Sequence, residues 1–456
     1  MVCDIIHKMK FVLFTIALVV GIPAVATATA FSATLKRLAL SFMIVTYLFG
    51  SMVSINLMSM ELYRGPVRGF EITLSDIICV GLILGMLMRS ASLVIYRPRF
   101  SLLLSLFFIY SIVNVQQSSY PIYGWFAVWQ MFRMGLVYWC IINFFATESY
   151  SYASIDALML GYTISALIMG LMSFKQKYMD GIYRTAIFFD HSNTVPSFAL
   201  IIVCLMFVWV LYDARSSLIK HVIALTASLA LVFSIFSTGS RTGMVTAAAS
   251  VVGAMIISNR KNNASRVRFT TIVLIMAMVA GGLMVLDTVI DRFLNAPESS
   301  EEARNEFEIA AIMMADDHQW GVGINQYSQV LTENKTYREH IQVMKYEEQA
   351  GVAHHIYLLT AAEMGYFGMY VFIAILALFI LTMGLSGLAW KTLEQRLLLA
   401  LSVGFLVLAA IGLYEWVIRQ SPVLYQMATA AAFGQALVSS CKNQKKESRL
   451  VKEQMK

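Results

Sequence analysis

Apolar runs that approach the length needed to cross a bilayer follow one another along most of the chain. They lie at residues 11–30, 38–58, 72–94, 100–115, 124–146, 154–174, 191–212, 218–238, 242–258, 269–290, 356–384, 397–415 and 422–440. A transmembrane helix needs about 20 apolar residues, and only short polar stretches separate most of these runs. The pattern therefore predicts an all-α integral membrane protein, a bundle of about 12–13 transmembrane helices with one large loop before the last helices.

The composition supports a membrane protein and excludes a soluble enzyme. Of the 456 residues, 59% are hydrophobic and only 13% are charged, whereas soluble domains carry about 25% charged residues. The net charge of +7 comes from basic residues spread over short loops and the C-terminal tail, which fits the positive-inside rule better than a nucleic-acid surface. The five cysteines form no CxxC spacing, so neither a disulfide framework nor a thiolate metal site is predicted.

The basic residues also predict how the chain is oriented. They gather in the loops at 215–220, 260–268 and 391–396 and in the tail from Lys442, which we therefore expect to be cytoplasmic. The acidic stretch in between then faces the periplasm. The expected regions are N-terminal transmembrane helices at 1–290, a periplasmic loop region at 291–355, C-terminal transmembrane helices at 356–440 and a basic cytoplasmic tail at 441–456.

The first apolar run has two interpretations that conflict. Lys8 and Lys10, the apolar run and the Ala-rich stretch after it are typical of a cleaved signal peptide. Lys36 and Arg37, however, place the following loop in the cytoplasm, which cleavage would not allow. We favour an uncleaved first helix and leave the sidedness of the N-terminus open.

Arg241 is the first candidate for chemistry, because it lies in FSTGSRTGMV, a small-residue turn between two apolar runs. A guanidinium offers a two-pronged fork of donors that matches phosphate. The alternative is an arginine that extends toward the lipid headgroups. Arg184 and Asn193 frame a second polar stretch, YRTAIFFDHSNTVPSFAL, which suits a polar or anionic group or serves as an ordinary loop and helix cap. Asp190 and His191 have no further ligands at metal-binding spacing, so no metal site is predicted.

The chain returns to the membrane through a third polar stretch. Gly323 and Asn325 in WGVGINQYSQV predict a turn, and GVAHHIYLLTAAEMGYFG follows it. On the helix expected there, His354 and Tyr357 share one face. A histidine at the mouth of a bundle is a suitable general base near neutral pH. The alternative is a pair of histidines that merely anchors the helix at the interface.

The four motifs STGSRTG, RTAIFFDHSN, GVGINQY and HHIYLLTAAEMGYFG together resemble the O-antigen ligase and polymerase superfamily, over roughly residues 180–420. In that family a histidine is usually followed by asparagine, and a Glu-x-Gly pattern comes later. Here His355 stands at the asparagine position, so the resemblance aligns His354 with the catalytic histidine. Glu363 matches the glutamate.

The resemblance implies transfer of a glycan from undecaprenyl diphosphate to a saccharide hydroxyl, on the periplasmic side of the bacterial inner membrane, with inversion and without a metal or other cofactor. The acceptor is lipid A core for a ligase or a second lipid-linked unit for a polymerase, and the motifs do not separate these. His354 would be the base, and Arg241 and Arg184 would hold the diphosphate. The expected substrate-binding residues are Arg304, Asn193, Gly323, Asn325, Tyr357 and Glu363.

A polysaccharide flippase or other transporter without catalysis is the alternative function. A transporter usually places its charged residues near the middle of the membrane, whereas these arginines and His354 map to one side. Arg133 is the exception, because it lies inside a predicted span, where it could pair with a carboxylate such as Asp76.

Overall fold

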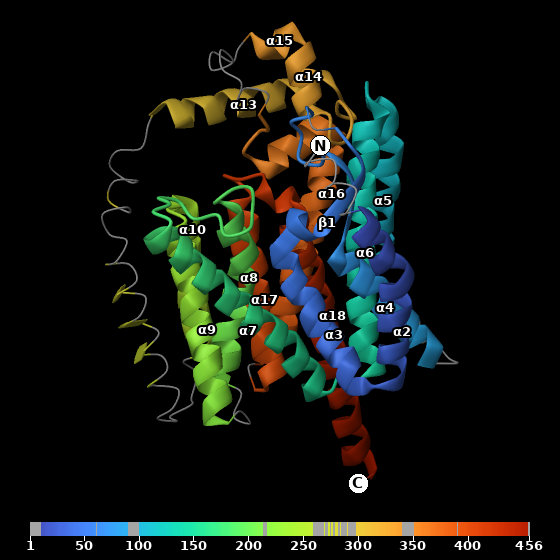
Figure 1. Cartoon of the computed structure of the whole chain (residues 1–456), viewed down its shortest axis with the longest axis vertical. Helices are drawn as coiled ribbons and strands as arrows, with labels where there is room; N and C mark the ends of the chain where they lie inside the picture. The colour runs from blue at the N-terminus through green and yellow to red at the C-terminus, as the bar shows by residue number, and fades with distance from the viewer. Residues whose placement is uncertain are drawn as a thin grey trace.

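The computed structural model describes residues 11–60, 62–89, 100–212, 217–258, 298–339, 351–389 and 391–454, together with scattered residues between 269 and 290. Long helices run side by side in one bundle, and short helices of the predicted loop region cover one end of it (Figure 1). Within the described residues, eight helices are long and apolar enough to cross a membrane. The structure therefore confirms an all-α membrane protein.

The elements follow one another with short connections. In the first half they are η1 (Ala17–Gly21), α2 (Ile22–Phe31), α3 (Ala33–Thr46), η2 (Tyr47–Val53), β1 (Ser54–Ser59), β2 (Gly69–Thr73), α4 (Leu74–Arg89), α5 (Ser101–Asn114), η3 (Val115–Gln117), α6 (Pro121–Thr147), α7 (Tyr152–Phe174) and η4 (Lys175–Met179). They continue with α8 (Thr194–Tyr212), α9 (Leu218–Ser237), α10 (Arg241–Ser258), α13 (Glu298–Asp317), α14 (Tyr327–Glu333), α15 (Lys335–Arg338), α16 (Ile356–Gly387), α17 (Leu393–Ile411), η7 (Val417–Arg419) and α18 (Ser421–Gln454).

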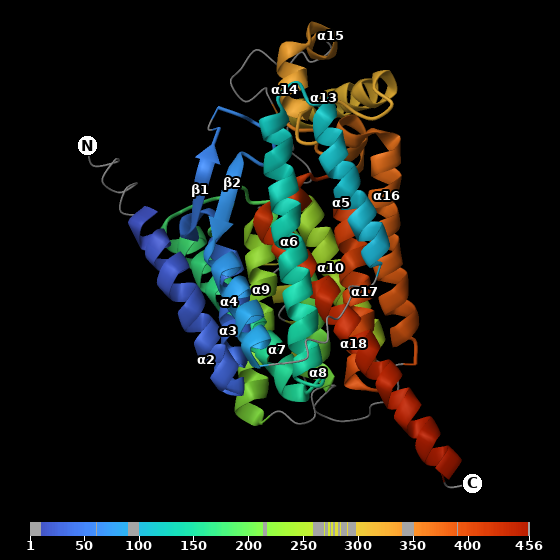
Figure 2. The same cartoon turned by 90° about the vertical axis from the view of Figure 1, so that its right-hand side faces the viewer.

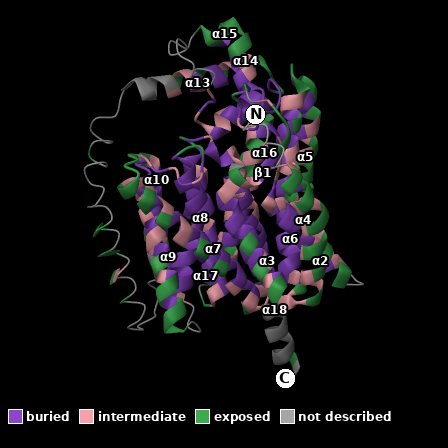
Figure 3. Ribbon diagram, in the orientation of Figure 1, coloured by how far each residue is buried: buried purple, intermediate pink, exposed green. Residues whose placement is uncertain are grey.

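Helix α8 is the centre of the bundle. Its apolar residues surround the whole helix rather than one stripe, a pattern that predicts burial on every side. The structure agrees, because the hydrophobic window of α8 is completely buried and the helix contacts α7, α9, α10, α17 and α18. Figure 3 shows buried residues along the middle of the bundle and exposed ones on its outer helices. The connection just before α8 is consequently fixed in place.

The predicted span at 38–58 is shorter than expected. Helix α3 ends at Thr46, and after η2 the chain forms β1, which pairs antiparallel with β2. Ser54 lies opposite Thr73, and Asn56 lies opposite Glu71. The residues of this hairpin, SINLMS and GFEIT, favour strands because they include β-branched and aromatic residues, and Ser and Asn are poor helix formers. The hairpin lies toward the same end of the bundle as the short helices (Figure 2).

Arg133 lies within α6 and is buried. Its Nε is 2.9 Å from Oδ2 of Asp76, which confirms the predicted pairing, and its Nη1 is 3.0 Å from Oε2 of Glu71. The hydroxyl of Tyr425 accepts from Arg133 and donates to Asp76 at 2.6 Å. Charged groups at membrane depth need such partners. The cluster joins β2, α4, α6 and α18.

Helices α13, α14 and α15 form a cap, defined here as residues 298–339. Helix α13 crosses the end of the bundle and packs against α16, while the C-terminal part of α18 projects from the opposite end (Figures 1 and 2). Helix α18 includes both the predicted span at 422–440 and most of the predicted tail. The span predicted at 269–290 falls where only scattered residues are described.

Candidate active site

Four segments that are distant in the sequence meet between the cap and the end of the bundle. They are the connection from η4 to α8, the first half of α13, the residues just before α16 and the connection from α17 to α18. Each contributes polar side chains, and the buried carboxylate of Glu415, which is only 3% exposed, lies among them. The residues that meet there are Arg184, His191, Asn193, Arg304, His354 and Glu415.

Arg184 is held by two hydrogen bonds in the connection before α8. Its Nε donates to the backbone oxygen of Thr238 at 3.1 Å, and its Nη2 donates to Oδ1 of Asn193 at 2.8 Å. The amide of Asn193 then donates from Nδ2 to Oε1 of Glu415 at 2.5 Å. The sequence paired Arg184 with Asn193, and the structure brings them into direct contact. Asn193 therefore orients the guanidinium of Arg184.

Arg304 reaches the same carboxylate from α13. Its Nη2 lies 3.6 Å from Oε1 of Glu415, an ion pair between a one-third exposed arginine and a buried glutamate. Burial raises the pKa of the Glu415 carboxyl to about 7, although Arg304 and Arg184 oppose this shift. Oε2 of Glu415 is buried and has no hydrogen-bond partner in the described part of the chain. Both arginines thus border one carboxyl group that gains or loses its charge near neutral pH.

His354 lies at the edge of this cluster, two residues before α16. Burial lowers the pKa of its imidazole to about 4, and the positive charges of Arg304 and His191 lower it further, whereas a hydrogen bond to the backbone of Val352 opposes the shift. Its Nδ1 is buried without a partner among the described residues. The imidazole is therefore neutral at pH 7, with a ring nitrogen that makes no hydrogen bond within the protein.

His355 has a different task from its neighbour. Its Nδ1 accepts a hydrogen bond from the backbone N–H of Leu358 at 3.2 Å, so His355 is the N-cap of α16. Tyr357, predicted to share a face with His354, donates its hydroxyl to the backbone oxygen of Ala409 at 2.6 Å. These two side chains fix the start of α16 against α17. They thereby position His354.

Arg241 is the first residue of α10, and its side chain is exposed. The turn before it, residues 238–240, is the turn that receives Arg184, and the backbone N–H of Thr185 donates to the oxygen of Ser237 at 3.2 Å. Arg241 therefore follows this turn directly. Its guanidinium makes no hydrogen bond or ion pair to other described residues, and it does not touch the cluster around Glu415.

The comparison with protein families bears on this same region. Residues 225–373 match the family model described as O-antigen ligase. This segment belongs to the O-antigen ligase and polymerase superfamily. A search of the curated proteins finds no match. The matched O-antigen ligase segment contains Arg241, Arg304 and His354, whereas Arg184, Asn193 and Glu415 complete the cluster from outside it.

Three predicted substrate-binding residues of the O-antigen ligase segment make their polar contacts inside the protein. Asn325 is fully buried, and its Nδ2 donates to the backbone oxygens of Val67 and Tyr123, both at 2.8 Å. Gly323 has a φ of +108°, and a Cβ there would lie 2.4 Å from Oγ of Ser118. Its N–H donates to the backbone oxygen of Glu363 at 3.0 Å. We therefore expect these residues to hold the cap on the bundle rather than to contact substrate.

Glu363 completes this support. Its side chain is fully buried, pairs with Arg419 in η7 and accepts from the backbone N–H of Tyr327 at 3.3 Å. The O-antigen ligase motif thus joins the cap, α16 and the connection from α17 to α18. Within the described residues, no three His, Cys, Asp or Glu side chains gather in a way that could hold a metal ion.

Sequence reasoning missed Glu415 and Arg419. Both lie in YEWVIRQS, between two apolar runs, and Glu415 was counted as the last residue of the span at 397–415. A carboxylate at that depth is itself a signal, because an ionisable residue within an apolar span usually has a partner or a function. That signal could have identified Glu415 but not its contacts with Asn193 and Arg304.

Proposed function

We propose that this multi-pass membrane protein transfers a glycan from undecaprenyl diphosphate to a saccharide hydroxyl, on the periplasmic side of the bacterial inner membrane. The family of residues 225–373 supports O-antigen ligase or polymerase-type glycan transfer in general. The observation that carries the finer proposal is the meeting of Arg184, Arg304 and a neutral His354 around Glu415. The acceptor is lipid A core or a second lipid-linked unit.

The two arginines suit the leaving group. A diphosphate gains negative charge as its bond to the sugar breaks, and guanidinium groups that are already fixed in position stabilise that charge without reorganising. Arg184 is fixed by Thr238 and Asn193, and Arg304 is free to exchange the 3.6 Å contact with Glu415 for a phosphate oxygen. Arg241, exposed near this turn, is a third donor for the diphosphate or the lipid headgroups. Its fork would be lost in Arg241→Lys.

His354 suits the acceptor. In the proposed reaction the acceptor oxygen attacks the anomeric carbon from the side opposite the diphosphate, and its proton passes to His354. The bond from the anomeric carbon to the diphosphate oxygen breaks, and undecaprenyl diphosphate leaves with the electron pair. The configuration at the anomeric carbon is inverted. A bound diphosphate offsets the positive field of Arg304, so donor binding raises the pKa of His354 toward the value expected of an effective base.

The test is the activity of His354→Ala in purified full-length protein, with an undecaprenyl diphosphate glycan as donor. Loss of a general base commonly costs about a hundredfold to ten-thousandfold in rate, so we expect nearly complete loss of transfer while donor binding persists. His355→Asn is the matched control, because asparagine is a good N-cap and can accept the same hydrogen bond from Leu358. It should keep most of the activity.

Separate reactions with lipid A core and with a second lipid-linked unit distinguish a ligase from a polymerase. Full activity in His354→Ala would remove the proposed base. Donor movement across a vesicle without transfer to either acceptor would instead support the transporter.

A further inference from the structure

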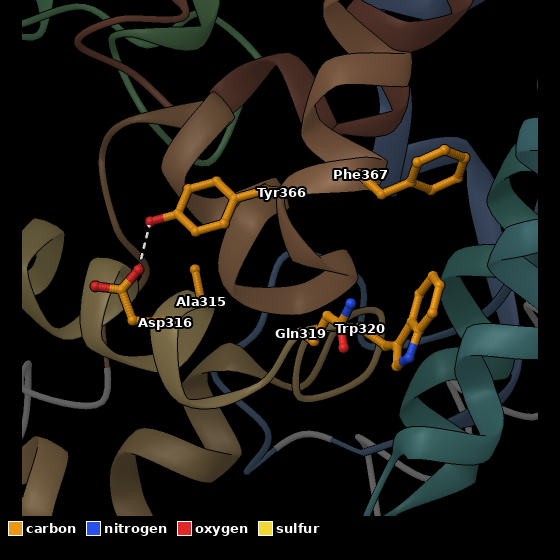
Figure 4. A pocket seen from close by; sticks show the side chains of 6 residues that line it. All are labelled: Ala315, Asp316, Gln319, Trp320, Tyr366 and Phe367. Atoms are coloured by element: carbon orange, nitrogen blue, oxygen red, sulfur yellow. Dashed lines mark hydrogen bonds between the residues drawn. The ribbon is translucent and has the colours of Figure 1, made fainter.

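A hollow lies where the cap meets α16, away from the cluster around Glu415. Its volume is about 500 Å³, within the range of about 300–1,000 Å³ that is usual for small-molecule sites. Figure 4 shows its walls, which come from the end of α13, the turn after it and the part of α16 beyond Gly365. The residues that line it are Ala315, Asp316, Gln319, Trp320, Tyr366 and Phe367.

The lining combines exposed aromatic rings with polar groups. Trp320 is 51% exposed and Phe367 is 55% exposed, a large area of bare aromatic surface. Asp316 and Gln319 are exposed beside them, and Oδ1 of Asp316 accepts from the hydroxyl of Tyr366 at 2.8 Å. The faces of aromatic rings carry partial negative charge, which attracts the polarised C–H groups of a sugar ring. Carboxylate and amide groups pair with its hydroxyls.

The protein holds these groups in place before any ligand binds. Nδ2 of Asn114 donates to the backbone oxygen of Trp320 at 2.7 Å, and Phe367 packs edge-on against Tyr110 with ring centroids 5.2 Å apart. Gly365 breaks α16 with a φ of +68°, and a Cβ there would lie 2.2 Å from the backbone oxygen of Gln319. Only glycine therefore lets the turn come this close to α16.

Helix α13 connects the hollow with the proposed active site. Arg304 and Asp316 lie twelve residues apart on this helix, which corresponds to about 18 Å at a rise of 1.5 Å per residue. A glycan of a few units that reacts at the cluster can reach the hollow along α13. A single sugar cannot.

We propose that the hollow is a saccharide subsite that binds glycan units remote from the reacting sugar. The proposal rests on the proposed function, because the donor or the acceptor must be a glycan of several units. The competing interpretation is an aromatic belt, since Trp and Tyr gather at membrane–water interfaces. A belt would not need the adjacent carboxylate, amide and preformed turn.

Binding of delipidated O-polysaccharide to the purified full-length protein, measured by calorimetry, tests the subsite directly. Loss of one stacked ring is worth about 1 kcal/mol or more, so we expect Trp320→Ala to weaken binding about tenfold. Trp320→Phe keeps a ring face and should retain most of the affinity. The matched control is Trp125→Ala, because Trp125 is 40% exposed on α6 near the same end of the bundle. It should bind normally.

Transfer kinetics give a second, independent measurement. With a donor that carries several repeat units, Trp320→Ala should raise KM with the effect confined to KM. Unchanged binding and KM in Trp320→Ala would overturn the subsite, as would equal losses in Trp125→Ala and Trp320→Ala, which indicate anchoring. Absence of transfer by the wild-type protein would refute the proposed function alone, provided that binding still depends on Trp320.

Discussion

Glu415 joins the polar groups of the candidate site at the level of single residues. One carboxyl oxygen accepts from Asn193, which in turn holds Arg184, and the same oxygen pairs with Arg304. A donor diphosphate would compete with this carboxyl group for the arginines. The charge of Glu415 therefore influences how tightly the proposed donor binds.

This competition predicts a dependence on pH. Because burial raises the pKa of Glu415 to about 7, the carboxyl group is neutral below that pH and negatively charged above it. The charged form repels the diphosphate and holds Arg304, so kcat/KM for the donor should fall as pH rises through about 7. The pKa of His354, about 4, lies below this range and does not add to the change. The measurement is kcat/KM from about pH 5 to about pH 9, which reports the ionisation of the free enzyme.

Glu415→Gln removes the charge but keeps an oxygen that can accept from Asn193. We expect this variant to retain activity and to lose the decline above neutral pH. Glu333→Gln is the control, because Glu333 bonds with Gln329 and Tyr120 at the same end of the molecule, outside the cluster. An identical pH profile for Glu415→Gln and the wild-type protein would show that another group titrates.

At the level of elements, the connection from α17 to α18, residues 412–420, organises the site. Glu415 contacts Asn193, Arg419 pairs with Glu363 in α16, and Gln420 accepts from Thr194 at 2.6 Å. The backbone oxygen of Gly412 also accepts from Ile356 at 2.9 Å. The connection thereby holds the starts of α8 and α16 in fixed relation to each other.

The pair of Glu363 and Arg419 predicts a stability effect. Removal of one partner of a buried ion pair leaves an uncompensated charge and typically costs about 3–5 kcal/mol. Glu363→Leu should therefore lower the Tm in detergent markedly. The double variant Glu363→Leu, Arg419→Met should recover most of the loss, because it removes both charges and keeps similar volume. Equal destabilisation in the single and double variants would mean that packing, not charge, holds the connection.

The sequence predicts some of these elements much better than others. Long apolar runs predict helices such as α8, because burial on all sides needs no further information. The hairpin of β1 and β2 was missed, because its residues continue an apolar run and only pairing with a distant segment reveals it. In the site, Arg184 and His354 stand out as polar residues in small motifs. The contacts of Glu415 depend on how separate helices pack, and single-sequence patterns contain little of that information.

At the level of the whole molecule, the cap and the C-terminal part of α18 lie at opposite ends of the bundle (Figure 1). The distribution of basic residues predicts that the cap is periplasmic and the tail cytoplasmic. Single cysteines at positions 335 and 445, introduced after removal of the five native cysteines, should differ in labelling by an impermeant thiol reagent. In intact cells with a permeabilised outer membrane, we expect labelling at 335 and protection at 445. The reverse pattern would place the candidate site in the cytoplasm.

The position of the 412–420 connection also has a consequence for biosynthesis. A chain grows from its N-terminus, so Arg184, Arg304 and His354 are all synthesised and inserted before Glu415 and Arg419 exist. Until then, Asn193 lacks its carboxylate partner and Glu363 lacks its counter-charge. A chain that stops after α17 would thus contain the arginines and the histidine in an unassembled state. Translation therefore delays completion of the site until α18 can close the bundle, which protects the growing cell envelope from partly made and unregulated copies.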